Sequence, residues 1–247
     1  MKTFCADLKT LYHLLLKPAP GSDHAERMES FYAGQADGYD RFRERLLPGR
    51  RELFDAIPVP PAGVWVDLGG GTGANFESLG PRIEQLQSAY VVDLSPSLLA
   101  IAEKRIERYG WSNVRACRAD ATQFRPPEGQ ADVVTCSYAL TMIPDWFAAV
   151  ENAAAMLKPG GMIGVVDFFV SRKHPAQGSP RHSWLSRLFW PAWFAGDNVF
   201  LSADHLPFLR GHFEQIACTE SSARLPYLPV VRVPYYMFAG RKQSTPG

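Results

Sequence analysis

Residues 66–74 constrain the fold of this chain more than any other stretch. An apolar, strand-like run reaches Asp67, and glycines follow at alternate positions, 69, 71 and 73. Glycine lacks Cβ and tolerates positive φ, and a helix that begins after such a loop presents free N–H groups. The pattern is therefore typical of a buried parallel strand that turns into a helix and leaves room for a ligand against its backbone.

The acid that precedes the glycines narrows the choice of ligand. Gly69, Gly71 and Ala74 also satisfy the dinucleotide pattern G-x-G-x-x-G/A, but Asp67 would repel a pyrophosphate. No Gly-Lys-Ser/Thr follows, which argues against a P-loop, and a tight turn without a ligand remains an alternative. A cationic sulfonium nucleotide, S-adenosylmethionine, fits best. The predicted cofactor contacts in this loop are Asp67, Gly69, Gly70, Gly71, Thr72 and Gly73.

Two further acids end the next two predicted strands. Asp93 closes the run 89–93, and Ser95-Pro96 after it suits a helix start with Ser as N-cap. An acid at the end of a second strand can accept hydrogen bonds from both ribose hydroxyls. Asp120 follows the strand-like run 114–119 and is placed to accept a hydrogen bond from the adenine amine. Three acids after three successive strands predict a nucleoside site.

Strand-like and helix-like patterns alternate from Val64 onward. This alternation predicts an α/β fold with a doubly wound parallel sheet and with the ligand at the carboxyl ends of the strands. Gly80-Pro81 is expected to break the first helix. Strands are expected near 64–68, 89–93, 114–119, 132–137, 162–168, 214–221 and 233–240, and helices near 74–86, 96–109 and 146–157.

Two segments outside this alternation combine apolar and basic residues. Residues 3–16 predict a helix with one apolar face, and residues 23–47 predict one or two more. Residues 171–201 gather Trp and Phe beside Arg, Lys and His, and Ser202 is expected to cap a short helix after them. This long connection is either a helical insert that buries its own aromatics or a platform for a fatty acceptor, with cations at the level of lipid headgroups.

Composition excludes several classes of function. The 247 residues, 46% of them hydrophobic, suit one large α/β domain, and a formal net charge of +1 argues against a nucleic-acid partner. The 4 cysteines form no C-x-x-C and the 6 histidines show no ligand spacing, so no metal is expected. No signal peptide and no run of about 20 apolar residues is found. A cytoplasmic protein, peripherally associated with the inner face of the membrane, is expected.

The motifs resemble those of class I S-adenosylmethionine-dependent methyltransferases. The resemblance covers about residues 28–240 and includes the glycine loop, Asp93, Asp120 and Leu157-Lys158-Pro159-Gly160-Gly161. It implies a seven-stranded Rossmann-like sheet whose last strand is antiparallel, with N-terminal helices and a helical insert before the last two strands. It also implies a methyl-transfer site lined by residues 137–144 and further cofactor contacts at Leu94, Ala121 and Ser137.

Two flanking stretches look like the bacterial betaine-lipid N-methyltransferases, which trimethylate the amine of diacylglycerylhomoserine. They are Phe31–Arg50, where Pro48 departs from an expected histidine, and Pro226–Tyr236. The chain then divides into residues 1–60, N-terminal helices that form a cofactor lid and a possible membrane contact, and residues 61–247, the methyltransferase domain with its insert at 171–201. The expected partner is a lipid with an amino headgroup, which becomes diacylglyceryltrimethylhomoserine.

The expected chemistry is an in-line displacement on a neutral amine, which requires alignment and a dry site. Tyr32 and Tyr138 are the candidate catalytic residues, and Tyr39 is a cofactor contact beside Tyr32 in the lid. Tyr138 offers a π face to the growing ammonium and also contacts the substrate, and Arg232 pairs with the headgroup carboxylate. The sequence does not identify a catalytic base.

Other acceptors and a non-catalytic role stay open. A quinone, phosphatidylethanolamine or another small amphipathic acceptor is compatible with the same fold, as is a non-catalytic adenosylmethionine-binding protein. Methylation of a nucleic-acid base is disfavoured, because the fourth strand ends in Cys136-Ser137-Tyr138-Ala139 rather than in an Asn/Asp-Pro-Pro-aromatic motif.

Overall fold

A computed structural model describes residues 47–196, 198–225 and 228–243 of the chain. The predicted helix at 3–16, nearly all of the helical stretch predicted at 23–47, and the candidate residues Tyr32 and Tyr39 lie outside the described residues. The described chain begins just before a short helix, α4, Arg50–Ala56.

The described strands form one seven-stranded mixed sheet in the order β3-β2-β1-β4-β5-β7-β6. The first five strands run parallel, whereas β7 lies antiparallel between β5 and β6. The predicted seven-stranded, Rossmann-like sheet is therefore confirmed, including the antiparallel last strand. The strands are β1 Val64–Leu68, β2 Ser88–Asp93, β3 Val114–Arg118, β4 Ala131–Ser137, β5 Leu157–Phe168, β6 Glu214–Leu225 and β7 Leu228–Arg241.

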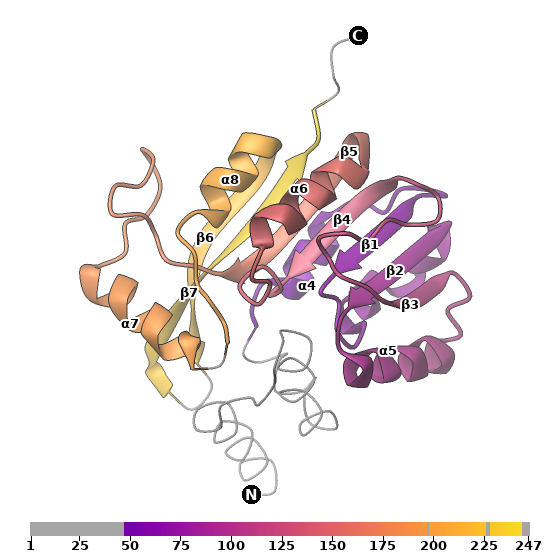
Figure 1. Cartoon of the computed structure of the whole chain (residues 1–247), viewed down its shortest axis with the longest axis horizontal. Helices are drawn as coiled ribbons and strands as arrows, with labels where there is room; N and C mark the ends of the chain where they lie inside the picture. Colours follow the sequence, from indigo (N-terminus) through magenta and orange to yellow (C-terminus); the bar gives the residue numbers. More distant parts are fainter. Residues whose placement is uncertain (1–46, 197, 226–227, 244–247) are drawn as a thin grey trace, which may run out of the picture.

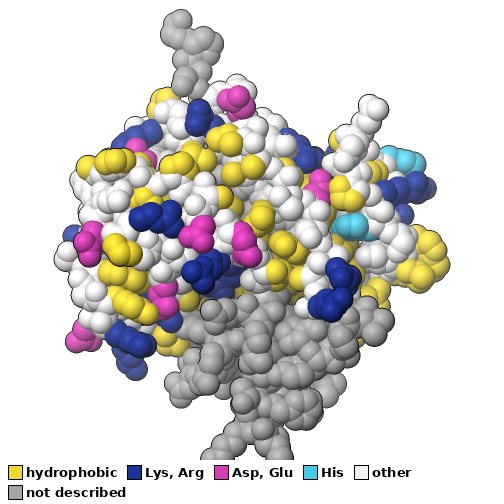
Figure 2. Space-filling model, turned by 180° about the vertical axis from the view of Figure 1, so that it is seen from behind, with side chains coloured by type: hydrophobic (Ala, Val, Ile, Leu, Met, Phe, Trp, Pro, Cys, Tyr) yellow, Lys and Arg dark blue, Asp and Glu magenta, His cyan; other side chains and the backbone are white. Residues whose placement is uncertain are grey.

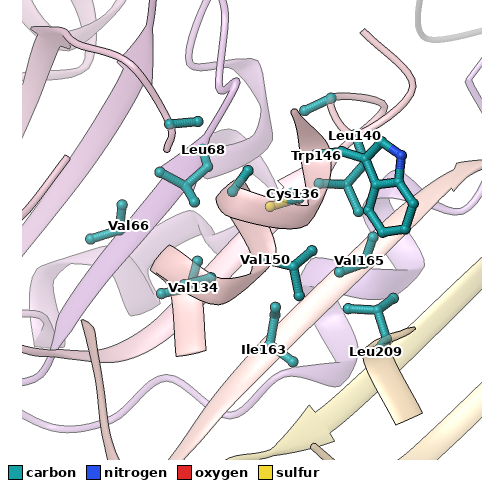
Figure 3. Close-up of a cluster of buried hydrophobic side chains, with 14 of the residues drawn as sticks. Val66, Leu68, Val134, Cys136, Leu140, Trp146, Val150, Ile163, Val165 and Leu209 are labelled. Carbon is teal, nitrogen blue, oxygen red and sulfur yellow. The ribbon is translucent and has the colours of Figure 1, made fainter. Parts of the chain in front are cut away.

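Helices cover both faces of this sheet (Figure 1), as a doubly wound fold requires. On one face, α6 and α8 bury apolar side chains against the strands, and Figure 3 shows Val150 and Leu209 there beside Val134 and Val165. On the other face, α4, η1, α5 and α7 pack against the sheet residues Trp65, Val91 and Val166. These elements are η1 Ala74–Gln85, α5 Pro96–Tyr109, α6 Trp146–Met156, α7 Trp184–Ala195 and α8 His205–His212.

Several local predictions are confirmed. Ser95 caps α5 by accepting a hydrogen bond from the Leu98 N–H at 3.3 Å, with Pro96 as the first helical residue. Gly80, with φ 53° and ψ −138°, interrupts η1 just before Pro81. The last two strands also lie where they were expected, although both are longer. The glycine turn expected before β5 differs: β5 begins at Leu157 directly after α6, and Gly160, with φ 78°, lies inside the strand, where the pairing of β5 with β4 shifts register between Leu157 and Met162.

Two other details differ from the predictions. The helix expected at 74–86 is a 3-10 helix rather than an α-helix, and it is interrupted at Gly80, just before Pro81. Ser202 does not cap α8. Its hydroxyl accepts a hydrogen bond from the Asp204 N–H at 3.0 Å, and Asp204 is the residue that precedes the helix. The predicted insert contains one helix, α7, within otherwise irregular chain.

Candidate active site

The glycine loop after β1 is held against both neighbouring strands. The N–H groups of Gly69 and Gly70 donate to the carbonyl oxygen of Val92, at 2.8 and 3.0 Å. Gly69 has φ +69°, and a Cβ on it would lie 2.5 Å from the Cβ of Ala139, in the loop after β4. The loop therefore needs glycine for its backbone angle and for its closeness to the β4 loop.

Asp93 joins the glycine loop to the start of α5. One carboxylate oxygen accepts a hydrogen bond from the Gly71 N–H and the other from the Ser95 N–H, each at 2.9 Å. The side chain is only 9% exposed, and its exposed edge faces a cavity at the carboxyl ends of the strands. An acid at the end of the second strand, beside such a cavity, is the usual acceptor for ribose hydroxyls.

The cavity has a volume of about 280 Å³ and lies among the ends of β1, β2, β3 and β4. This is close to the lower end of the range of about 300–1,000 Å³ typical of ligand sites. Leu98 and Ile143 supply apolar walls, while Asp93 and Asp120 supply acceptors, which matches an adenosyl group. The lining residues are Gly69, Val92, Asp93, Leu94, Leu98, Ala119, Asp120, Ala121, Thr122, Tyr138, Ala139, Met142, Ile143, Pro144 and Asp145.

The loop after β3 is fixed by its own polar contacts. One Asp120 carboxylate oxygen accepts hydrogen bonds from the N–H and the hydroxyl of Thr122, both at 2.8 Å. Asn152 of α6 donates to the carbonyl oxygen of Ala121 at 2.8 Å. These bonds hold Asp120, Ala121 and Thr122 as one wall of the cavity, where the sequence predicted an adenine contact.

Asp67, which the sequence predicted as a cofactor contact, bonds to protein side chains instead. Its carboxylate is fully buried and accepts hydrogen bonds from Thr135 Oγ1 at 2.7 Å and from Asn75 Nδ2 at 2.8 Å. Burial raises the pKa of Asp67 to about 6, and the bonds to Asn75 and Thr135 oppose the rise. Asp67 is not part of the cavity wall described above. Its contacts indicate that it positions the start of η1.

This buried network reaches α4. Arg50 donates from Nε and Nη2 to Oδ1 of Asn75, at 2.9 and 2.6 Å, and Asn75 in turn holds Asp67. Arg105 of α5 donates to the carbonyl oxygen of Thr72 and pairs with Glu77. The two arginines thus hold the end of the glycine loop from two helices.

Tyr138 forms the part of the wall between the cavity and α4. Its φ of 53° is uncommon for a residue other than glycine, and its hydroxyl donates to the carbonyl oxygen of Pro48 at 2.7 Å. The ring lies 4.6 Å from that of Phe168, centroid to centroid. Burial raises the pKa of Tyr138 well above its ordinary value. At neutral pH Tyr138 therefore stays a neutral phenol and does not act as a base.

Sequence reasoning missed Asp167, which fixes the loop after β4. Its fully buried carboxylate accepts hydrogen bonds from Thr141 Oγ1 at 2.7 Å, from the Phe168 N–H at 2.8 Å and from the Thr141 N–H at 3.1 Å. Burial raises the pKa of Asp167 to about 7, and the bonds with Thr141 oppose the rise. One signal was present in the sequence: Asp167 is the one charge in the run 162–170.

Several predicted site residues do not line the cavity. Gly70, Gly71, Thr72 and Gly73 shape the loop without lining the cavity, and Ser137 lies buried with no hydrogen-bond partner for its hydroxyl among the described residues. Arg232 is exposed on β7, beyond the part that pairs with β5, and lies directly opposite Arg224 of β6. Leu98, Thr122 and Asp145 line the cavity and were not predicted.

The described residues include neither a metal-binding cluster nor a membrane-spanning helix. They contain no group of three or more His, Cys, Asp or Glu side chains arranged to hold a metal ion. Among these same residues, no helix has both the length and the apolar character needed to cross a membrane.

Known proteins resemble this chain in sequence, mainly in its methyltransferase-like part. A family profile described as "Methyltransferase domain" matches residues 66–161. The ubiquinone/menaquinone biosynthesis C-methyltransferase UbiE of Pseudomonas fluorescens strain Pf0-1 is 26% identical over 169 residues, and the match spans 66% of this chain and 66% of that relative.

Solved structures share the fold. An O-methyltransferase family protein from Burkholderia thailandensis superimposes with a TM-score of 0.65 at 20% identity, over 97% of this chain and 69% of that one. The N-methyltransferase NodS from Bradyrhizobium japonicum WM9, in complex with S-adenosyl-L-homocysteine, gives a TM-score of 0.55 at 16% identity, over 96% and 98% of the two chains. Residues 66–161 therefore match a methyltransferase domain, within a chain that has the fold of solved methyltransferases, and the cofactor of such a domain is S-adenosylmethionine.

Proposed function

We propose that this chain is an N-methyltransferase that trimethylates the amine of diacylglycerylhomoserine and forms diacylglyceryltrimethylhomoserine. The observation that carries the proposal is the combination, in one chain, of a cofactor cavity with an exposed apolar helix, α7, in the insert before the last two strands. The resemblance of Phe31–Arg50 and Pro226–Tyr236 to betaine-lipid N-methyltransferases supports the same acceptor. The enzyme would then work on the inner face of the membrane.

The residues of the cavity suit this reaction. Bound S-adenosylmethionine supplies an electrophilic methyl carbon, with its ribose at Asp93 and its adenine beside Asp120 and Ala121. Tyr138 and Met142 form the wall near the expected methyl group, and the Tyr138 hydroxyl is already held by Pro48. The ring of Tyr138 therefore acts as an aromatic surface for the ammonium that develops, a contact worth about 0.5–2 kcal/mol. Tyr32 and Tyr39 are the proposed lid over the cofactor.

Arg232 is the proposed partner of the acceptor's carboxylate. Arg224 and Arg232 face each other across β6 and β7, and like charges directly opposite in an antiparallel pair repel each other. No acidic side chain of the described residues pairs with either arginine. A carboxylate between them would relieve this repulsion and orient the headgroup.

A quinone-type acceptor is the second candidate. The likeness to a C-methyltransferase of ubiquinone and menaquinone biosynthesis, which spans 66% of this chain, favours it. The two candidates differ in the atom that receives the methyl group: an amine nitrogen in the first and a ring carbon in the second.

A labelling experiment separates the two candidates. The full chain is incubated with methyl-labelled S-adenosylmethionine and, in parallel, with diacylglycerylhomoserine, phosphatidylethanolamine and a demethylated quinone, and the products are identified by mass spectrometry. We expect label in the mono-, di- and trimethylated forms of diacylglycerylhomoserine. Label only in the quinone, or in no lipid at all, would refute the proposed acceptor.

The variant Arg232→Gln tests the headgroup contact. Loss of a charge-assisted pair is expected to lower kcat/KM for the lipid by about tenfold or more, while the affinity for the cofactor stays unchanged. Arg115→Gln, on β3 at the far side of the sheet, is the matched control. Equal activity of Arg232→Gln and the wild-type chain would remove Arg232 from the site.

A further inference from the structure

Helix α7 consists almost entirely of apolar residues. Its twelve residues, Trp184–Ala195, include only two that carry a charge or a hydroxyl, Ser186 and Arg187. A helix that is hydrophobic on all sides is normally buried on all sides. In this chain one side of α7 is exposed although it is apolar.

The inward side of α7 anchors the helix to the domain. Trp190 and Phe194, one turn apart, are buried in the same cluster as Val233 of β7, and the ring of Phe194 stacks on that of Phe168 with centroids 4.9 Å apart. Ahead of the helix, Ser171 and His182 exchange two hydrogen bonds, at 2.8 and 3.0 Å. These contacts fix which side of α7 faces outward.

The outward side consists of large apolar side chains. Trp184, Leu185, Leu188 and Phe189 follow the i, i+1, i+4, i+5 spacing of one helical face and are 65%, 59%, 65% and 45% exposed. They make up half of the eight large hydrophobic side chains that are exposed in the described part of the chain. Figure 2, seen from behind, shows this apolar surface as a projection at the edge of the molecule. Concentrated apolar surface of this kind marks an interaction site.

The charged residues within the segment that carries α7 are all basic, and one of them, Arg172, forms an ion pair with Asp204 of the following segment. Residues 168–196 contain 4 Lys and Arg and no Asp or Glu, although the whole chain carries a formal net charge of only +1. Lys173 and Arg181 lie exposed ahead of the helix, and neither forms an ion pair among the described residues. Trp and Leu on one face with nearby cations is the composition of helices that lie in the interface of a bilayer with anionic lipids.

We propose that α7 docks this protein on an anionic phospholipid surface. The outward side chains, led by Trp184 and Leu188, enter the boundary between headgroups and acyl chains, and Lys173 and Arg181 lie at the level of the lipid phosphates. The buried side of α7 holds the helix against β7, so docking places the sheet edge with the cofactor cavity at a fixed height over the bilayer. Anionic phospholipid recruits the protein in this way whichever acceptor is methylated.

Vesicle co-sedimentation of the full chain, without cofactor or acceptor, tests the proposal. Vesicles of phosphatidylglycerol and phosphatidylcholine are compared with vesicles of phosphatidylcholine alone. Leu188→Glu is the test variant, and Ile216→Glu, which adds the same charge at a 49% exposed position on β6, is its matched control. Thermal unfolding and calorimetry with S-adenosylhomocysteine check that both variants fold.

The wild-type chain is expected to bind the anionic vesicles and to bind the neutral ones more weakly. Leu188→Glu should lower the partition onto anionic vesicles about tenfold or more, a change of about 1.4 kcal/mol, while Ile216→Glu stays within about twofold. Wild-type chain that ignores anionic vesicles, or equal losses in both variants, would overturn the proposal. Light scattering could also overturn the proposal. If the wild-type chain is a dimer and Leu188→Glu dissociates it, a second copy of the chain covers α7.

Discussion

Asp67 and Asp93 show how the same residue type takes two roles at the ends of neighbouring strands. Asp93 borders the cavity and is partly exposed, whereas Asp67 is fully buried and holds Asn75 and Thr135. The sequence predicted that both acids contact the cofactor; Asp93 lines the cavity, and Asp67 does not. The sequence could not reveal that Thr135, 68 residues away, donates to Asp67, because that pairing depends on the register of β1 with β4.

Gly69 gives a prediction for a single backbone position. Gly69→Ala combines a positive φ with a contact of 2.5 Å to Ala139, so the glycine loop must move. We expect cofactor affinity, measured by calorimetry, to fall about tenfold or more, and the free energy of unfolding to fall by roughly 1–3 kcal/mol. The matched control is Gly129→Ala, which has φ +82° and open space around the added methyl group.

The control separates backbone strain from the steric contact. Gly129→Ala should lose stability through its φ alone and should bind the cofactor like the wild-type chain. If Gly69→Ala also binds the cofactor normally, the loop does not approach the ligand in the way the geometry indicates.

Among the elements, the loop after β4 depends on a buried carboxyl group, that of Asp167. Thr141 lies just before Met142 in the cavity wall, and Asp167 of β5 holds Thr141 through both its N–H and its hydroxyl. Burial raises the pKa of Asp167 to about 7, whereas a free aspartate has a pKa of about 3.9. The folded chain therefore keeps a proton on Asp167 over a range in which the unfolded chain releases it.

This proton makes stability depend on pH. The stabilising contribution of protonated Asp167 is complete below about pH 4 and is lost as the pH rises through about 7. We expect the free energy of unfolding, from urea titrations, to fall between about pH 5 and pH 8, by on the order of 1–4 kcal/mol. Asp167→Asn cannot ionise and should flatten this slope, whereas Glu103→Gln on the exposed side of α5 should not.

The slope need not vanish in Asp167→Asn. Burial raises the pKa of Asp67 to about 6, so Asp67 contributes a change of the same sign. An unchanged slope in Asp167→Asn would contradict the assignment to Asp167.

The elements that the sequence predicted best are those whose pattern is local. Mainly apolar runs such as Val64–Leu68 placed the parallel strands, and Ser95-Pro96 marked the start of α5. Gly80-Pro81 indicated a break but not the 3-10 geometry on both sides of it. The exposure of α7 could not be predicted, because its apolar residues fit a buried helix equally well until the packing of Trp190 and Phe194 fixes its orientation.

For the whole molecule, the sheet order explains why residues far apart in the sequence share one cavity. The order β3-β2-β1-β4 brings the carboxyl ends of four strands to one edge, so Gly69, Asp93, Asp120 and Tyr138 meet there. This gathering could be predicted, because ligands bind parallel sheets at that edge. The apolar walls at Leu98 and Ile143 could not, since nothing in their local sequence separates them from ordinary core residues.

The central claim is that Asp93 holds the ribose of an adenosyl cofactor in this cavity. Calorimetry with S-adenosylhomocysteine and with its 2′,3′-dideoxy analogue tests the claim most directly, in the wild-type chain and in Asp93→Ala. The wild-type chain should bind the parent ligand about tenfold or more tightly than the analogue, because hydrogen bonds to a carboxylate contribute about 1.5–3 kcal/mol. In Asp93→Ala the ratio of the two affinities should fall to about one. A ratio that stays the same in both proteins, or a wild-type chain that binds neither ligand, would contradict the account.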